Sequence, residues 1–276
     1  MNTSTQKLKI NGIELNVLLA GPEDGPPVLL LHGFPDDHTV WRYQIPELVK
    51  AGYRVIAPDT RGTGDSELLP HVSDYGMKHL VADQIALLDY LGLKKVRLVA
   101  HDWGAIQGWA LVLRHPERFD RYMALSVGHP WCYTRAGWQQ KQKGWYVYFF
   151  QTGALARWIC SLNDWNVFRH FLQFESEWPH IKQQYSRLGR FAAGQNYYVS
   201  NLRKWHAAPP TPAQIPVMGV YSTADIALVE KQMTLSEKLC PKGWRYERLE
   251  GVGHWMTLEA PARVTALMLD YLKSPL

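Results

Sequence analysis

The sequence has few cysteines and no long apolar segment, and both absences exclude classes of protein. Its 276 residues include only Cys132, Cys160 and Cys240, with no C-x-x-C spacing. Neither a disulfide framework nor a structural zinc site is therefore expected. No apolar run approaches the roughly 20 residues of a membrane-spanning helix, and the N-terminal segment lacks the apolar stretch of a signal peptide. A reducing, cytoplasmic setting is the expectation.

The charge is modest in size and unevenly distributed. The formal net charge is +5, and residues 129–214 hold ten Lys and Arg against three Asp and Glu. These basic residues are interspersed with Trp and Gln, whereas a nucleic-acid-binding protein usually gathers them in a stripe. We expect a solvated basic surface on one part of the molecule, with no binding of nucleic acid or membrane.

Short β-branched and Leu-rich segments alternate with longer helical patterns. The expected strands are 7–10, 14–19, 27–32, 54–57, 96–100, 122–127, 217–221 and 246–249, and the expected helices lie near 39–51, 75–91, 103–114, 229–239 and 261–273. The segment 96–100 is apolar apart from Arg97, as in a strand that is covered on both faces. This alternation predicts an α/β fold with a mostly parallel eight-stranded sheet and helices on both faces.

Residues 129–214 interrupt the alternation. They contain seven of the 12 Trp and six of the 14 Tyr, and no convincing strand. We predict that they form a helical cap, or lid, inserted into a core domain made of residues 1–128 and 215–276. Some of the aromatic side chains are expected to line a pocket at the end of the sheet, and others to form a small core within the cap.

The sequence Val99-Ala100-His101-Asp102-Trp103-Gly104 lies between an expected strand and an expected helix, which is the context of a nucleophile elbow. Small residues two positions before and after the centre allow the strand and the helix to approach closely. The centre is Asp102, where serine hydrolases have Ser. A carboxylate is ionised at neutral pH, so it can attack an electrophilic carbon directly and form an ester. An isolated Asp at the start of a helix more often caps it, so the choice between the two interpretations depends on other motifs.

A second motif, His32-Gly33-Phe34-Pro35, follows an early apolar strand. A glycine turn at this point allows the next main-chain N–H to face the nucleophile. The N–H groups of Phe34 and Trp103 are therefore predicted to form an oxyanion hole. His32 and His101, which lie beside the two motifs, are interpreted as supporting residues.

A general base and its acid follow the last strands. His254 lies in Gly251-Val252-Gly253-His254-Trp255, directly after the last expected strand. Asp225 follows the strand 217–221, where it can orient an imidazole and stabilise its charged form. The chain order nucleophile, acid, histidine is that of the α/β-hydrolase fold.

With these residues in place, the sequence resembles the epoxide hydrolases of the α/β-hydrolase fold over nearly its whole length, from HGFP through HDWG to GVGHW. In that family two lid tyrosines activate the substrate oxygen. The resemblance implies that Tyr146 and Tyr198 occupy those places, with Tyr148 and Tyr197 as the alternatives.

The resemblance also implies a reaction in two steps. Asp102 attacks an epoxide carbon while Tyr146 and Tyr198 hold and protonate the oxygen, because a phenol can donate a proton at neutral pH without being ionised. His254, oriented by Asp225, then activates the water that hydrolyses the ester to a vicinal diol. No metal or organic cofactor is expected.

Four aromatic residues are expected to bind the substrate: Phe34, Trp103, Tyr146 and Tyr198. Their character indicates a small apolar or aryl epoxide in a largely dry pocket.

Other activities on the same fold remain as alternatives. A haloalkane dehalogenase shares the Asp nucleophile and Trp103, but many of those enzymes have Asn in the place of Phe34, whose side chain offers no N–H to a halide. A fluoroacetate-type dehalogenase is expected to carry Arg where Trp103 stands, and a serine esterase needs Ser in the place of Asp102. A non-catalytic binding protein is the other class, but such proteins commonly lose triad residues and all three are present here.

Overall fold

The computed structural model describes residues 3–206 and 209–273. One sheet has the strand order β1-β2-β4-β3-β5-β6-β7-β8, and the strands are β1 Thr3–Ile10, β2 Ile13–Ala20, β3 Pro27–Leu31, β4 Arg54–Pro58, β5 Val96–His101, β6 Phe119–Leu125, β7 Val217–Ser222 and β8 Trp244–Leu249. Strand β2 is antiparallel to both of its neighbours, β1 and β4. The remaining neighbours in the sheet, from β4 and β3 to β7 and β8, pair in parallel. The predicted fold, a mostly parallel eight-stranded sheet, is confirmed.

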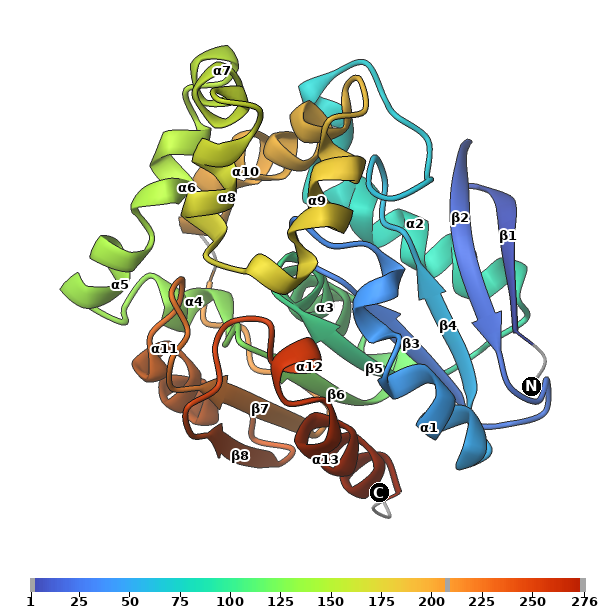
Figure 1. The fold of residues 1–276 in the computed structure, drawn as a ribbon. Helices are drawn as coiled ribbons and strands as arrows, with labels where there is room; N and C mark the ends of the chain where they lie inside the picture. Colours follow the sequence, from blue (N-terminus) through green and yellow to red (C-terminus); the bar gives the residue numbers. More distant parts are fainter. Residues whose placement is uncertain (1–2, 207–208, 274–276) are drawn as a thin grey trace.

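Helices cover both faces of the sheet (Figure 1). The helices α1 (Gln44–Lys50) and α13 (Pro261–Lys273) lie together on one face, and α2 (Met77–Tyr90) and α3 (Trp103–Arg114) lie together on the other. A short α12 (Met256–Glu259) precedes α13. The parallel strands are therefore shielded from water on both sides, which is what their continuous apolar sequences require.

The central strand β3 illustrates how the sequence fills both layers. Val28 and Leu30 belong to the apolar core on the α1 and α13 face, whereas Leu29 and Leu31 belong to the core on the α2 and α3 face. All four side chains are fully buried. Successive side chains of a strand point to opposite faces, so a strand buried on both faces must be apolar at every position.

Several boundaries differ from the sequence prediction. The helix expected near 39–51 is divided into a 3-10 turn, His38–Trp41, and α1, because Pro46 lacks an N–H and fits only the first turn of a helix. The helix expected near 229–239 is α11 (Glu230–Thr234) followed by a 3-10 turn, and Ser236 in that turn bonds back to the carbonyl of Gln232. The strand β6 ends before Ser126, whose φ is +70°.

Between β6 and β7 the described residues form helices and no strand. These cap helices are α4 Pro130–Tyr133, α5 Trp138–Lys143, α6 Trp145–Phe150, α7 Ala154–Ser161, α8 Asn166–Leu172, α9 Trp178–Tyr185 and α10 Arg190–His206. They lie above the carboxyl ends of the central strands (Figure 1). Their aromatic side chains form an apolar cluster that also includes Phe34 and Trp103 from the sheet side. The division of the chain into a core and a cap of residues 129–214 stays a prediction.

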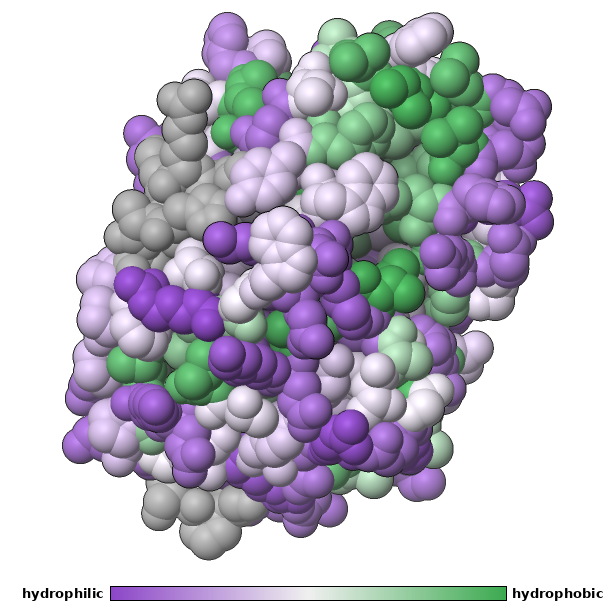
Figure 2. Space-filling model, turned by 90° about the vertical axis from the view of Figure 1, so that its left-hand side faces the viewer, coloured by the Kyte–Doolittle hydropathy of each residue, from purple (hydrophilic) through white to green (hydrophobic). Residues whose placement is uncertain are grey.

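The cap helices also expose large apolar side chains. Trp138, Trp145 and Trp158 are each more than half exposed, and apolar side chains gather over the upper part of the face shown in Figure 2. Within the described residues, no helix has both the length and the apolar character needed to cross a membrane.

Candidate active site

Asp102 occupies the sharp turn between β5 and α3. Its backbone has φ +50° and ψ −121°, a conformation that residues other than Gly rarely adopt. Its carboxylate makes no capping hydrogen bond to α3, so the helix-capping interpretation is wrong. Instead Oδ1 accepts a hydrogen bond of 2.8 Å from the main-chain N–H of Phe34. The turn thus aims a buried carboxylate away from its own helix.

Two glycines allow this arrangement. A Cβ atom on Gly33 would lie 2.5 Å from Oδ1 of Asp102, and one on Gly104 would lie 2.5 Å from the carbonyl oxygen of His32. Both distances are far inside van der Waals contact. Gly33 therefore leaves room for the carboxylate, and Gly104 lets α3 start against the end of β3. Trp103 is the first residue of α3, where main-chain N–H groups have no partner within the helix.

The structure brings the predicted base and acid to Asp102 from distant parts of the chain. His254, after β8, donates from Nδ1 to Oδ2 of Asp225 over 2.9 Å, and its Nε2 lies 3.5 Å from Oδ2 of Asp102. All three side chains are buried. The imidazole is therefore held between two carboxylates, with Nε2 directed at the nucleophile.

The electrostatics of this triad favour the ionised forms. Burial by itself would lower the pKa of His254, but the carboxylates of Asp225 and Asp102 outweigh it and raise that pKa well above its usual value. Burial by itself would raise the pKa of Asp102, but hydrogen bonding with His254 and the Phe34 N–H lowers it. The resting state is thus an imidazolium between two carboxylates.

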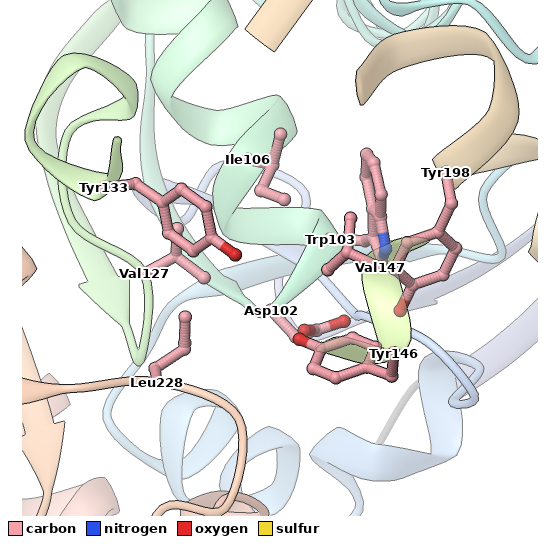
Figure 3. A pocket seen from close by; sticks show the side chains of 9 residues that line it. All are labelled: Asp102, Trp103, Ile106, Val127, Tyr133, Tyr146, Val147, Tyr198 and Leu228. Carbon is pink, nitrogen blue, oxygen red and sulfur yellow. The ribbon is translucent and has the colours of Figure 1, made fainter. Parts of the chain in front are cut away.

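Tyr146 from α6 and Tyr198 from α10 face Asp102 (Figure 3). Burial raises the pKa of each phenol well above its ordinary value, so both remain protonated donors. The Tyr198 ring packs edge to face against the Trp103 ring, with 4.9 Å between the ring centroids.

The alternative tyrosines lie elsewhere. Tyr148 is 54% exposed on α6. The hydroxyl of Tyr197 is buried, donates to the carbonyl oxygen of Arg61 over 2.7 Å and shares a hydrogen bond of 2.9 Å with the hydroxyl of Thr60. Neither residue lines the cavities described next.

Two cavities meet at Asp102, Tyr146 and Tyr198. The smaller, of about 50 Å³, is mostly apolar and is also lined by Trp103, Ile106, Val127, Tyr133, Val147 and Leu228 (Figure 3). The larger, of about 360 Å³, is also lined by Phe34, Lys143, Trp145, His170, Phe171, Leu172, Gln173, Ile226, Ala227, His254 and Trp255. A bound molecule can therefore place a group on each side of the carboxylate.

Two buried side chains near the triad, His101 and Asp36, interact with each other. Their position beside the motifs is the only sign of a role that the sequence gives. His101 donates from Nε2 to the carbonyl oxygen of His254 over 2.9 Å, and its Nδ1 lies 4.0 Å from Oδ2 of Asp36. Burial, and after it the positive charge of His254, lowers the pKa of His101 to about 4. Burial, and after it the charge of Asp102, raises the pKa of Asp36 to about 8. At neutral pH the pair is a neutral acid facing a neutral imidazole.

The raised pKa of Asp36 predicts a pH-dependent cost in stability. The folded protein keeps a proton that the unfolded chain releases above its ordinary pKa of 3.8, so stability falls as the pH rises from about 4 to about 8. Asp36→Asn removes this loss. We expect the free energy of unfolding of the variant, relative to the wild type, to increase by about 2 to 3 kcal/mol between pH 5.5 and 8.5. Denaturant titrations of both proteins at both pH values measure this, and a constant difference would contradict it.

One group of three acidic and histidine side chains has ligand atoms close enough to hold a metal ion. In the described part of the chain these are Asp37, His38 and Asp59, with atoms within 4.8 Å of one another. Hydrogen bonds already engage them: His38 with Asp59 at 2.7 Å, and Asp37 with His180 of α9 at 2.9 Å. We interpret the group as a hydrogen-bond network that links the sheet to the cap helices.

Comparisons with known proteins cover the sheet and the cap helices alike. A family model described as the alpha/beta hydrolase fold matches residues 26–261. The chain is 31% identical to AB hydrolase superfamily protein YfhM of Bacillus subtilis over 98% of both sequences, and 29% identical to Epoxide hydrolase A of Mycobacterium tuberculosis over 99% of this chain and 98% of that protein. The crystal structure of Epoxide Hydrolase A from Mycobacterium thermoresistibile matches with a TM-score of 0.87 and 26% identity, over 99% of both chains.

Proposed function

The chain belongs to the alpha/beta hydrolase fold family and is an epoxide hydrolase, and on that premise we propose that it converts epoxides to vicinal diols through a covalent ester on Asp102. The observation that carries the proposal is the shared position of one ionised carboxylate and two protonated phenols, Tyr146 and Tyr198, at the meeting point of two cavities. An epoxide needs this combination, a nucleophile at carbon and a proton donor at oxygen.

In the first half-reaction, Oδ2 or Oδ1 of Asp102 attacks an epoxide carbon and the carbon–oxygen bond of the ring breaks. The oxygen that leaves would be an alkoxide, so it needs a donor as the charge develops. Tyr146 and Tyr198 supply hydrogen bonds, and one of them supplies the proton. The product is a hydroxyalkyl ester of Asp102.

The second half-reaction follows from the loss of charge on Asp102. The ester is neutral, so one of the two carboxylates that raise the pKa of His254 no longer does so. The imidazolium then returns a proton to the tyrosinate left by the first half-reaction. The neutral imidazole acts as a general base on water, while Asp225 keeps its orientation. Water attacks the ester carbonyl carbon, and the N–H groups of Phe34 and Trp103 stabilise the tetrahedral oxyanion. The diol leaves with an oxygen that came from Asp102.

The remaining parts of the proposal concern the surroundings. We propose that residues 129–214 act as the cap over the site, and that Phe34 and Trp103 line it together with the two tyrosines. The apolar lining favours a small apolar or aryl epoxide. The proposed reaction uses water and no metal or organic cofactor, and the cytoplasm is its proposed location.

Haloalkane dehalogenation is the nearest alternative with the same nucleophile. It requires side-chain N–H donors for the departing halide. The Phe34 ring packs against Phe150 and Tyr198 and offers none, and the Trp103 ring packs edge to face against Tyr198. We therefore expect no halide release from chloro- or bromoalkanes.

A single turnover in ¹⁸O-labelled water, with enzyme in excess over styrene oxide, tests the ester directly. The first diol should contain only ordinary oxygen, and the label should enter Asp102. Immediate appearance of the label in the diol would contradict the proposal, because water would then have attacked the epoxide itself.

Gly33→Ala tests the geometry of the nucleophile. The added methyl group would lie 2.5 Å from Oδ1 of Asp102, so it must displace the carboxylate from the Phe34 N–H. We expect the rate of ester formation to fall by about 100-fold, the effect typical of a displacement near 1 Å. Single-turnover kinetics with styrene oxide measure this rate. An unchanged rate would mean that the position of Asp102 is not set by this contact.

A further inference from the structure

The loop that carries the catalytic acid has no regular secondary structure of its own. This acid loop, residues 225–229, follows β7 and reaches the start of α11. Oδ1 of Asp225 accepts the main-chain N–H groups of Ala227 and Leu228, at 2.7 and 3.0 Å. Asp225 cannot satisfy the carbonyl groups of the loop, because a carboxylate only accepts hydrogen bonds, and buried carbonyl groups need donors.

Helix α5 of the cap supplies those donors. The side-chain amide of Gln140 donates to the carbonyl oxygen of Ala227 over 3.0 Å and accepts the N–H of Val229, also over 3.0 Å. The ammonium group of Lys143, one turn further along, donates to the carbonyl oxygens of Asp225 and Leu228. Gln140 is 3% exposed, so water cannot readily replace its two bonds.

These contacts join two parts of the chain that are far apart in sequence. Gln140 lies 87 residues before Ala227, within the segment 129–214, whereas Ala227 follows that segment. Leu228 lines the smaller cavity, and Ala227 lines the larger one. The acid loop therefore forms part of the lining of both cavities, and side chains of α5 hold it in place.

We infer that Gln140 and Lys143 are positioning residues for the second half-reaction, because they hold the acid loop and so fix Asp225 against His254. The inference rests on the proposed function. A single acceptor atom, Oδ2 of Asp225, orients the imidazole, so a small movement of the loop changes the direction of Nε2. Helix α5 thereby couples the cap to the hydrolytic step.

The first half-reaction depends less on this loop. Asp102 is held by the turn between β5 and α3 and by the Phe34 N–H, and the Tyr198 ring packs against Trp103. None of these contacts passes through the acid loop. Loss of the α5 contacts should therefore slow hydrolysis of the ester and leave its formation nearly unchanged.

Gln140→Leu tests this because it keeps the approximate volume and removes both hydrogen bonds, and because Gln140 lines neither cavity. Single-turnover mixing with styrene oxide, followed by intact-protein mass, gives the rates of ester formation and loss. We expect ester formation within twofold of the wild type and ester hydrolysis about 10- to 100-fold slower, with the ester accumulating. The neighbouring exposed residue provides the control, Gln139→Leu, for which both rates should stay unchanged.

Lys143 provides a second test, which also serves if Gln140→Leu does not fold. Lys143 also lines the larger cavity, so the measure for Lys143→Met is the ratio of the rate of ester hydrolysis to the rate of ester formation. This ratio should fall in Lys143→Met, and Lys143→Arg, which keeps donors and charge, should restore most of it. Equal slowing of both half-reactions, or no slowing of either in a folded variant, would overturn the inference. If the wild-type enzyme itself forms no ester, the proposed function fails instead, so the two failures are distinguishable.

Discussion

Replacing His254 by Gln is expected to stop the enzyme after ester formation and to leave the substrate attached to Asp102. Gln cannot act as a general base, so the water that should attack the ester is no longer activated. Turnover should fall by at least about 10³-fold, as for other enzymes that lose their general base. After mixing with styrene oxide, the intact mass of the protein should rise by the mass of one substrate molecule.

The location of the added mass decides between an ester and adventitious alkylation. Peptide mapping should place it on the peptide that contains Asp102, and the double variant Asp102→Ala with His254→Gln should gain no mass. The three cysteines are buried, which limits a competing reaction with the epoxide. If Asp102→Ala retained activity, or if His254→Gln gained no mass, the covalent mechanism would be wrong.

The architecture of the sheet could be predicted from the sequence because its strands are buried on both faces. A run such as Val28–Leu31 must be apolar at each position when two helical layers cover it, and this pattern is visible without a structure. The ends of elements were predicted less well. They depend on local features such as Pro46, which delays the start of α1, and on the φ of +70° at Ser126, which ends β6.

The candidate triad could also be predicted, since each member directly follows a strand of a parallel sheet and the carboxyl ends of such strands meet at one edge. The environment of each group could not. Asp36 and Asp37 are neighbours in sequence, yet burial raises the pKa of Asp36, whereas Asp37, although burial opposes it, is hydrogen-bonded by His180 and has a lowered pKa. The residue that makes the two pKa values differ is His180 of α9, which lies more than 140 positions away in the sequence.

The choice between adjacent tyrosines likewise needed the helices. Tyr146 and Tyr148 lie two positions apart on α6, which places them about 200° apart around the helix axis, so only one of them can face the cavity. Tyr197 and Tyr198 are about 100° apart on α10, and the first points to Thr60 while the second points to Asp102. A shift of one residue along α10 would bring Tyr197 to the place of Tyr198, and a shift of two residues along α6 would bring Tyr148 to the place of Tyr146.

Removing the two phenols is expected to give the second large effect, this time on the formation of the ester. Tyr146→Phe and Tyr198→Phe should each slow ester formation by about 10²-fold, and the double variant by about 10³- to 10⁴-fold, because each removes a donor aimed at the developing alkoxide. The hydrolysis of an ester already formed should change little, since that step uses His254 and the oxyanion hole. Single-turnover rates of both steps with styrene oxide measure the difference.

The neighbouring tyrosines make this prediction specific. Tyr148→Phe changes the same helix at a position that is 54% exposed, so ester formation should stay within twofold of the wild type. Tyr197→Phe removes two buried hydrogen bonds, and it should lower the free energy of unfolding by about 1 to 2 kcal/mol with little effect on ester formation. If Tyr148→Phe or Tyr197→Phe slowed ester formation as strongly as Tyr146→Phe, the donors would be assigned to the wrong residues. If no variant slowed ester formation, the leaving oxygen would obtain its proton from another group. The position of the two phenols beside the carboxylate would then not support the proposed reaction.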